Sequence, residues 1–571
     1  MTTTTIDRSR DLSQPLDKLG PDERMKDASD YLRGMIADGL LDRITGAVPS
    51  ADDVKLMKFH GIYQQDDRDL REERRRQKLE PAYQFMIRVR LPGGVCTPAQ
   101  WLKLDALARA HGGETLRITT RQTFQFHWVL KHGLRPIIRG LHEALLDTVA
   151  ACGDDSRGVM CTVDPQASAF HAEVAATAKR VSDHVIPKTR AYHEIWYGDA
   201  RVAASEPEEP FYGRTYMPRK FKIGFALPPS NDIDVYAQDL GYIAIGGPDG
   251  LEGFNVAIGG SMGRTDQAPG TYPRLASIIG FVPTERLLAC TDAVMAVQRD
   301  YGDRKDRQHA RFKYTIDDKG LDWIKAEIER RMGAPFEDAR AFAFTSNGDS
   351  YGWNATPNGR HHRTVFIENG RLDLKLLDAL RDVARIHRGT LRLTPNQNVI
   401  IAGVAEGDRA GIDAVLAGHG LETDRVSTLR RNAIACVAFP TCGLAMAESE
   451  RYLPSLLGKV EAILTRHGLS GEPITVRMSG CPNGCSRPYI AEIGLTGRAP
   501  GKYNLYLGGG FHGQRLNRIV RENVGEPAIL EVLDDVLGRY AQDRLPGERF
   551  GDFTIRAGIV REVTEGRFFN D

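Results

Sequence analysis

Four of the eight cysteines in this 571-residue chain stand in two close pairs, which is its clearest chemical signal. Cys436 and Cys442 are separated by five residues, and Cys481 and Cys485 by three. Paired thiolates are the usual protein ligands of structural zinc and of iron–sulfur clusters. The gaps are wider than the two-residue gap typical of zinc, so we favour a four-iron cluster. Structural zinc and buried free thiols are the alternatives.

The remaining four cysteines show no such grouping. We expect them to be buried and to behave as small hydrophobic residues: Cys96, Cys152, Cys161 and Cys290.

Cationic side chains gather on predicted strands and turns of the N-terminal half, which lacks paired cysteines. They are Arg88, Arg90, Arg117, Arg121, Arg157 and the run Arg219-Lys-Phe-Lys222. Strand alternation places Lys220 and Lys222 on one face, and Arg88 and Arg90 on another. Cations that point into a crevice are costly unless an anion compensates them. We therefore expect a small oxyanion or a carboxylate-rich cofactor there, although a surface salt bridge explains any single arginine. His127 by itself is expected to be a hydrogen-bonded core histidine.

An internal repeat organises these residues. Three segments recur in the same order in the second half: 116–123 as 391–398, 157–161 as 432–436, and 253–260 as 502–509. The segment 227–232 takes the place of the loop that carries Cys481 and Cys485. Two related α+β halves around a pseudo-twofold axis are therefore expected. Their joint lies near residues 335–355, and the ligand site lies where the halves meet.

Local patterns predict the elements around these residues. Helical spacing covers residues 22–42, and residues 85–91 read as a strand that ends in the turn Pro92-Gly-Gly. A helix follows from Pro98 to His111. The mixed charge run 68–80 is expected to be a solvated helix face or a surface arm.

Composition excludes several protein classes. The net charge is +1, so a general nucleic-acid binder is not expected. No run approaches the length of a membrane span, and the polar residues 1–15 lack a secretory signal, so we expect a cytoplasmic protein. No glycine-rich dinucleotide motif is placed on a strand–turn–helix, so electrons must come from a partner.

With these residues in view, the chain resembles the sulfite/nitrite reductase family, and within it the haemoprotein (β) components of assimilatory sulfite reductases. The likeness runs from about Asp22 to Phe553. Its most specific strings are residues 58–69, 88–94, 120–127 and 218–222 and the two cysteine motifs. Gly443 and Lys58 depart from the expected Pro and Arg. The segment 436–442 has the sulfite-type form, which favours sulfite over nitrite.

The resemblance implies an α+β, internally duplicated fold with two ferredoxin-like half-units and two larger catalytic units. The implied boundaries are an N-terminal arm (1–80), a first half-unit (81–150), a first catalytic unit (151–345), a second half-unit (346–428) and a cluster-binding unit (429–571).

The resemblance also implies the site. The four paired cysteines would hold a [4Fe–4S] cluster, and Cys485 would also be axial to a sirohaem iron. The substrate anion would be bound by Arg88, Arg157, Lys220 and Lys222. Sirohaem contacts would include Arg117, Arg121, Gln125, His127, Asn483 and Arg487.

The implied reaction is the six-electron reduction of sulfite to sulfide, with electrons from a partner flavoprotein that carries FAD and FMN and oxidises NADPH. Ferredoxin as the donor and nitrite as the substrate are alternatives within the family. A non-catalytic iron–sulfur or zinc protein is the alternative from another class.

Overall fold

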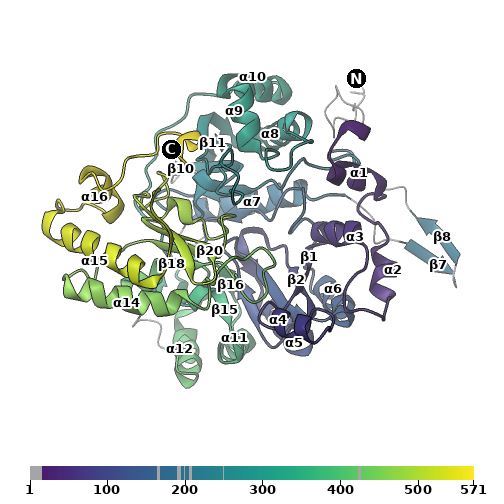
Figure 1. Cartoon of the computed structure of the whole chain (residues 1–571), viewed down its shortest axis with the longest axis horizontal. Coiled ribbons are helices and arrows are strands. Elements are labelled where there is room, and N and C mark those ends of the chain that lie inside the picture. The colour runs from purple at the N-terminus through teal and green to yellow at the C-terminus, as the bar shows by residue number, and fades with distance from the viewer. Residues whose placement is uncertain are drawn as a thin grey trace.

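The computed structural model describes residues 16–163, 168–188, 194–197, 200–204, 209–247, 250–421 and 426–571. In this part of the chain, four five-stranded sheets and one two-stranded hairpin carry the fold. Figure 1 shows the arrangement of the helices and strands. The hairpin joins β7 (Glu194–Tyr197) to β8 (Ala200–Ala204). No helix within the described ranges is long and apolar enough to span a membrane. The polar residues 1–15 lie outside these ranges.

Two small antiparallel sheets form the ferredoxin-like half-units. The first has the spatial order β1 (Ile62–Asp66), β2 (Tyr83–Arg88), β5 (Phe124–Val129), β4 (Leu116–Ile118) and β15 (Arg371–Leu372). The second has the order β13 (Gly352–Ala355), β14 (His361–Val365), β17 (Val399–Val404), β16 (Thr390–Leu393) and β3 (Val95–Cys96). Each sheet therefore takes its last strand from the other half of the chain. This exchange ties the half-units together through β3 and β15.

Helices pack on these sheets in matching positions. They are α5 (Pro98–His111), α6 (Leu134–Glu143), α11 (Leu374–Ile386) and α12 (Arg409–Gly418). The predicted helix 98–111 is confirmed, and its start is well specified because Thr97 and Gln100 form a capping box before the apolar run. Trp101 of α5 and Leu380 of α11 belong to one hydrophobic core, which both half-units share.

The two larger units have sheets of identical topology. The first has the order β6 (Met160–Cys161), β9 (Ile223–Ala226), β10 (Leu240–Gly247), β11 (Gly250–Ile258) and β12 (Ser277–Pro283). The second has the order β18 (Ala433–Ala435), β19 (Val476–Ser479), β20 (Ile493–Ala499), β21 (Lys502–Leu507) and β22 (Arg518–Val524). In both sheets the first three strands are parallel to one another, and each of the last two is antiparallel to the strand before it in the sheet. The duplicated α+β fold is therefore confirmed.

The strand register corrects one detail of the repeat. Cys161 pairs with Phe225, and Ala435 pairs with Met478 at the corresponding place in the second sheet. The counterpart of Cys161 is therefore Ala435, one residue before Cys436.

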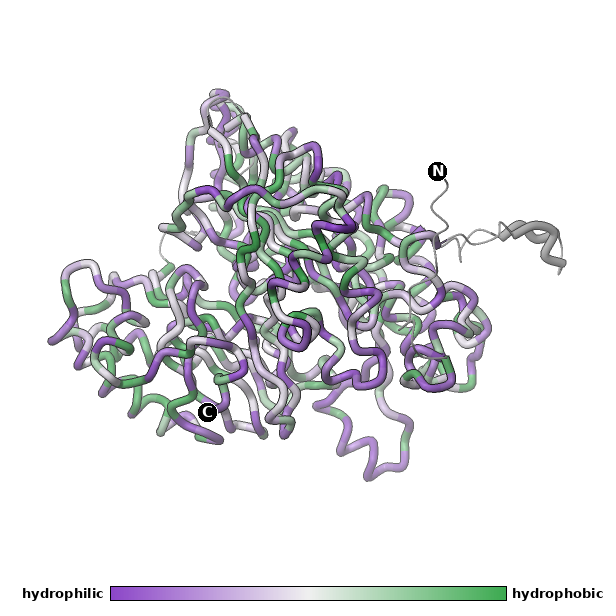
Figure 2. Tube along the Cα trace, turned by 90° about the horizontal axis from the view of Figure 1, so that it is seen from above, coloured by the Kyte–Doolittle hydropathy of each residue, from purple (hydrophilic) through white to green (hydrophobic). Residues whose placement is uncertain are grey.

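Helices cover the larger sheets. The first unit has α7 (Ala169–His184), α8 (Leu287–Tyr301), α9 (Phe312–Lys319) and α10 (Leu321–Met332), and the second has α13 (Thr428–Arg431), α14 (Leu453–Arg466), α15 (Glu526–Asp543) and α16 (Phe550–Arg556). Figure 1 shows α8–α10 at the top and α14 and α15 at the left. Each unit has its own hydrophobic core. In Figure 2 the outer loops are mostly hydrophilic, and hydrophobic stretches run mainly through the interior.

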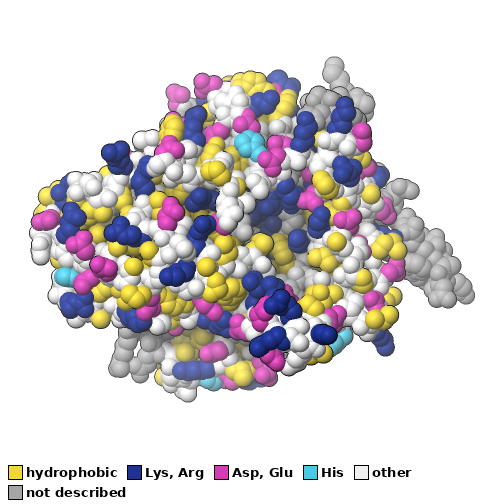
Figure 3. Space-filling view, viewed as in Figure 1, with side chains coloured by type: hydrophobic (Ala, Val, Ile, Leu, Met, Phe, Trp, Pro, Cys, Tyr) yellow, Lys and Arg dark blue, Asp and Glu magenta, His cyan; other side chains and the backbone are white. Residues whose placement is uncertain are grey.

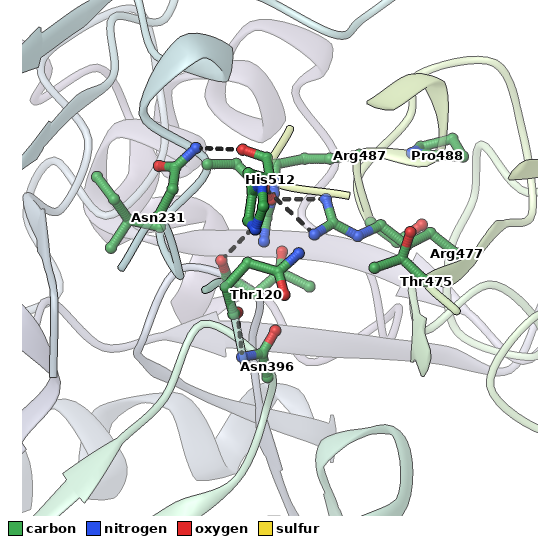
Figure 4. A network of polar contacts seen from close by, with 12 residues as sticks. Thr120, Asn231, Asn396, Thr475, Arg477, Arg487, Pro488 and His512 are labelled. Atoms are coloured by element: carbon green, nitrogen blue, oxygen red, sulfur yellow. Dashed lines mark hydrogen bonds and ion pairs between the residues drawn. The ribbon is translucent and has the colours of Figure 1, made fainter. Parts of the chain in front are cut away.

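Two equivalent residues meet near the pseudo-twofold axis. Asp234 and Arg487 precede equivalent 3-10 turns, and both are left-handed, with φ of 50° and 57°. The Arg487 Nε atom donates to the Asp234 carboxylate, which also accepts from Arg477 Nη1 at 2.6 Å. Arg487 Nη1 donates to the Thr120 carbonyl at 2.9 Å, and Figure 4 shows Thr120, Arg477 and Arg487 converging with Asn231. Equivalent residues lie close to each other only beside a twofold axis, so this contact agrees with a pseudo-twofold arrangement of the halves.

The segment that joins the halves packs against the second half. The Asp349 carboxylate accepts from Asn398 Nδ2 at 2.7 Å, Thr394 Oγ1 at 2.8 Å and Asn396 Nδ2 at 3.1 Å. Asn396 is the repeat equivalent of Arg121. The joining segment therefore covers the turn at residues 394–398, which is the repeat equivalent of the turn that carries Arg121.

The predicted helix over residues 22–42 is wrong as a single element. Two helices, α1 (Pro21–Ala28) and α2 (Ile36–Leu41), flank left-handed residues at positions 30–32. Ser29 Oγ accepts the N–H of Leu32 at 2.9 Å, and this local bond competes with helical hydrogen bonds. The turn buries Leu32 completely.

The rest of the N-terminal arm agrees with its charge pattern. A short helix, α3 (Ala51–Leu56), precedes β1, and α4 (Arg71–Arg76) has no buried residue. Apart from Arg68, the run 68–80 is therefore a solvated surface segment. The strand predicted for 85–91 spans Tyr83–Arg88, so Arg90 lies beyond its end.

Candidate functional site

The two cysteine pairs meet at one edge of the second large sheet. Cys436 follows β18, and Cys481 and Cys485 follow β19. These neighbouring strands are parallel, so the loops after them converge. The N–H of Cys436 donates to the Met478 carbonyl at 3.1 Å, and Cys436 Sγ accepts the N–H of Gly480 at 3.2 Å.

Gly480 allows the cysteine loops to approach closely. A Cβ at this position would lie 2.5 Å from Ala438 Cβ and 2.6 Å from the Ala447 carbonyl oxygen. The Gly480 carbonyl accepts the N–H of Met446 at 2.8 Å and that of Ala447 at 3.1 Å. The two cysteine-bearing loops are thereby fixed against each other.

The four thiols influence one another. Burial raises the pKa of Cys436 to about 12, and Cys485 and Cys442 raise it further. Burial and Cys485 also raise the pKa of Cys442 and of Cys481. These three thiols stay neutral at pH 7 unless a metal replaces the proton.

The spacing of these thiols bears on the kind of metal site. Among the residues that the structure describes, no three His, Cys, Asp or Glu side chains are close enough to surround one metal ion. Structural zinc would need its ligands at about 2.0–2.3 Å from a single ion. A cubane cluster binds each thiolate through a different iron, so its thiolates lie farther apart.

The two lysines of the predicted anion site lie just before β9 rather than on a strand, which corrects the expected element. The intervening Phe221 is buried and bridges to Ser156, so Lys220 and Lys222 still share a side. Burial and neighbouring cations hold the pKa of both lysines well below the ordinary value. For Lys222 the thiol of Cys485 opposes this decrease. The anion site and the cluster loop are therefore electrostatic neighbours.

Arg88 contacts a cysteine that sequence reasoning treats as inert. Its Nη1 atom lies 2.9 Å from Cys152 Sγ, and its guanidinium carbon lies 6.0 Å from the centroid of the Tyr63 ring. Burial and Cys152 raise the pKa of Tyr63 to about 12. Cys152 is buried as expected, but it is a hydrogen-bonding member of this cluster rather than a simple hydrophobic residue. Tyr63 is a further residue that the sequence analysis misses.

Arg157 enters the same region from the loop before β6. Its Nε donates to the Gly153 carbonyl at 3.1 Å and its Nη1 to the Ala151 carbonyl at 3.3 Å. Asp155 lies 3.9 Å away, but burial raises its pKa well above the ordinary value, which favours its neutral form. Arg90, by contrast, is a structural residue whose guanidinium donates to backbone carbonyls.

Charge compensation separates two groups of cations. Asp154 pairs with Arg307 at 2.8 Å, Lys26 at 3.6 Å and Arg219 at 3.7 Å. In the part of the chain that the structure describes, no carboxylate lies within 4.0 Å of the basic groups of Arg88, Lys220 or Lys222. Cations without a counter-ion favour an anionic ligand. Figure 3 shows Lys and Arg side chains around a hollow near the centre of the face in view.

One face of the first small sheet carries buried polar side chains with few hydrogen-bond partners. Both ring nitrogens of His127 and both amide atoms of Gln84 are buried without a partner in the described residues. Gln125 Nε2 has only a weak contact, with Met86 Sδ at 3.5 Å. His127 is therefore not the hydrogen-bonded core histidine expected from its strand. Gln84 was missed, although its alternation with Arg88 along β2 was a usable signal.

The predicted cofactor-binding arginines already have protein partners. Arg117 Nε lies 2.6 Å from Glu450, Arg121 Nη1 lies 2.8 Å from Gln238, and Arg487 pairs with Asp234. Burial and nearby arginines lower the pKa of Arg121 to about 9. The last predicted contact, Asn483, lies between the cysteines of the second pair, with Nδ2 3.6 Å from Cys481 Sγ.

Family models match most of the chain outside the cysteine-bearing unit. The nitrite and sulphite reductase 4Fe–4S domain matches residues 176–336. The nitrite/sulfite reductase ferredoxin-like half domain matches residues 76–144 and 354–419. The first match covers the large unit without paired cysteines, and the second large sheet repeats its topology and carries them.

Individual relatives agree over nearly the full length. A protein of Nitrosomonas eutropha named sulfite reductase (NADPH) hemoprotein beta-component is 72% identical over 99% of this chain and 99% of its own length. One of the same name from Staphylococcus carnosus is 55% identical, covering 96% and 97%. The solved structure of the Mycobacterium tuberculosis NirA protein superposes with a TM-score of 0.77 at 25% identity, covering 95% of this chain and 97% of that one. By these matches and by its duplicated fold, the chain belongs to the nitrite and sulfite reductase family.

Proposed function

We propose that this chain is the haemoprotein subunit of an NADPH-dependent sulfite reductase and reduces sulfite to sulfide. The relatives at 72% and 55% identity carry that name. The structural observation that supports the proposal most is a group of cations, Arg88, Lys220 and Lys222, with no carboxylate within 4.0 Å among the described residues. The thiol of Cys485 acts on Lys222, so this group lies near the cysteine loop.

The side chains fit the two cofactors of this reaction. We assign a [4Fe–4S] cluster to Cys436, Cys442, Cys481 and Cys485, with Cys485 shared with a sirohaem iron. The unpartnered nitrogens of His127 fit a carboxylate-bearing macrocycle, because such a ligand supplies the missing acceptors. The sirohaem contacts proposed from the sequence stay proposals: Arg117, Arg121, Gln125, His127, Asn483 and Arg487. When bound, the coupled cofactors would pass the six electrons from the donor to the substrate, because no side chain can carry them.

The chain's own residues bind and protonate the substrate in this account. Arg88, Arg157, Lys220 and Lys222 hold the anion and favour the negative charge that develops on oxygen as S–O bonds break. The lysines are the better proton donors, since burial lowers their pKa while an arginine keeps its proton.

Electrons reach the site from a second protein in this proposal. The sequence contains no dinucleotide-binding motif, so we assign NADPH oxidation to a partner flavoprotein with FAD and FMN. A ferredoxin is the second candidate donor. Nitrite is the second candidate substrate, because the matching domain models describe nitrite and sulfite reductases together.

Cofactor analysis combined with turnover tests the proposal. The purified chain should contain a tetrapyrrole with one iron and a cluster with four irons and four acid-labile sulfides. It should form sulfide from sulfite with reduced methyl viologen but not with NADPH alone. Absence of a tetrapyrrole would favour the non-catalytic alternative, robust turnover with NADPH alone would refute the partner, and faster turnover of nitrite would reassign the substrate.

A further inference from the structure

Arg68 of the N-terminal arm is bound to the loop that carries Cys442. The N–H of Arg68 donates to the Pro440 carbonyl at 3.0 Å. Its Nη1 atom lies within hydrogen-bond distance of three further carbonyl oxygens, those of Cys442 at 3.2 Å, Gly443 at 3.3 Å and Ala445 at 3.3 Å. A single side chain from a segment 374 residues away in sequence thus holds most of this turn.

Two more contacts strengthen this attachment. The guanidinium carbon of Arg68 lies 4.8 Å from the centroid of the Phe439 ring, within the range of a cation–π contact. The next residue, Asp69, pairs with Arg451 at 2.6 Å and 3.2 Å, in the segment that follows the loop. The arm therefore contacts both the cysteine loop and the segment after it.

The loop that carries Cys442 lies near the protein surface, so its attachment to Arg68 affects how firmly it can hold a bound cluster. Gly443 is exposed, Leu444 is 68% exposed, and Cys442 itself is only partly buried. A loop at the surface with few apolar contacts opens easily unless hydrogen bonds hold it.

Arg68 also brings an uncompensated positive charge to the thiols. No carboxylate lies within 4.0 Å of its guanidinium nitrogens in the described ranges; Asp66, which acts on it at longer range, pairs with Arg71. Its charge acts directly on Cys442. A fixed cation favours the more negative, reduced state of a nearby redox centre.

We propose that Arg68 is a positioning residue that holds the Cys442 loop and raises the reduction potential of the cluster bound there. The inference rests on the proposed function, because it requires that the four cysteines hold a cluster. It assigns to the N-terminal arm a role within the redox site.

Two substitutions separate charge from attachment. Arg68→Gln removes the charge and most of the carbonyl contacts, whereas Arg68→Lys keeps the charge without the planar donor fork. Arg75→Gln is the matched control, because it removes one cation from the same arm at a side chain that is 76% exposed and pairs with Glu72 in the same surface helix.

The readouts are the potential of the cluster, from an EPR-monitored redox titration, and its rate of loss to an iron chelator. We expect Arg68→Gln to lower the equilibrium constant for one-electron reduction about tenfold, which corresponds to about 59 mV, and to speed cluster loss. Arg68→Lys should keep the potential near that of the wild type but lose its cluster faster. Arg75→Gln should change neither.

Three outcomes decide the inference. A potential and a loss rate in Arg68→Gln equal to those of Arg75→Gln would overturn it while leaving the proposed function intact. Wild-type protein without a four-iron cluster would overturn both. If Arg68→Gln retains no cluster, Arg68→Lys decides: faster loss than in the wild type supports the inference, and an unchanged rate contradicts it.

Discussion

Lys220→Met is the substitution that examines the proposed anion site most sharply. The side chain has no carboxylate partner among the described residues, and burial together with Arg219, Lys222 and Arg311 lowers its pKa. Methionine keeps a similar unbranched shape but removes the charge. Because the lysine charge is disfavoured in the free protein, the variant should fold at least as stably as the wild type.

The expected effect on catalysis is large. Removing one preorganised donor from a buried oxyanion site costs about 3 kcal/mol, which is roughly a hundredfold in kcat. Arg88, Arg157 and Lys222 remain in the variant, so sulfite binding should weaken but persist. The cofactors should be retained, because the cysteines that we assign to them are untouched.

Steady-state sulfide formation with reduced methyl viologen measures this effect, and the absorption spectrum and melting temperature verify that the variant is loaded and folded. Lys179→Met is the control, since that lysine is 68% exposed on α7 and pairs with Asp183 in the next turn. Wild-type kcat in Lys220→Met would refute the anion-binding role. Loss of the tetrapyrrole with normal folding would show instead that Lys220 holds the cofactor.

Three further predictions concern the metal ligands and two titrating groups. Cys436→Ser should lose the four-iron cluster in iron and acid-labile sulfide analysis, whereas Cys290→Ser should keep it; a full cluster in the former would disprove the ligand set. Because its pKa is lowered, Lys222 loses its charge at a lower pH than an ordinary lysine does. The alkaline limb of the kcat/KM profile should therefore move to higher pH in Lys222→Arg. An unchanged limb would assign that titration to another group. Burial raises the pKa of Glu492 to about 7, so the folded state binds a proton that the unfolded state releases above about pH 4.5; stability should fall by at most about 3 kcal/mol as pH rises to 7. In Glu492→Gln, the free energy of unfolding measured with urea should differ less between pH 5 and pH 8 than in the wild type. An equal change with pH in the two proteins would contradict this assignment.

Features encoded in short stretches of sequence were predictable. Residues 98–111 form the expected helix because the capping box and the apolar spacing lie within one segment. The repeated strings led to the duplicated fold because each string spans a strand and the turn next to it. The two cysteine pairs were recognisable for the same reason, since each pair lies on a single loop.

Features that depend on pairing across the chain were not predictable. Nothing local indicates that β3 completes the sheet of the second half and β15 that of the first. The break between α1 and α2 depends on the burial of Leu32 in a core built from later segments, which overrides the helical spacing.

The same limit applies to the candidate site. Tyr63 and Cys152 are unremarkable in sequence and meet at Arg88 only after folding. The contact between Arg487 and Asp234, its own repeat equivalent, was likewise not visible in the sequence. Such partners lie more than 60 residues apart, as the 64-residue separation of Arg88 and Cys152 illustrates.

The stoichiometry of sulfide formation tests the central claim most directly. The purified chain is supplied with sulfite and a known amount of reduced methyl viologen, and both sulfide and oxidised viologen are counted. The account predicts one sulfide for every six electrons consumed, with no sulfide from the Cys485→Ser variant. Electron consumption without sulfide, or sulfide formation by Cys485→Ser at the wild-type rate, would contradict it.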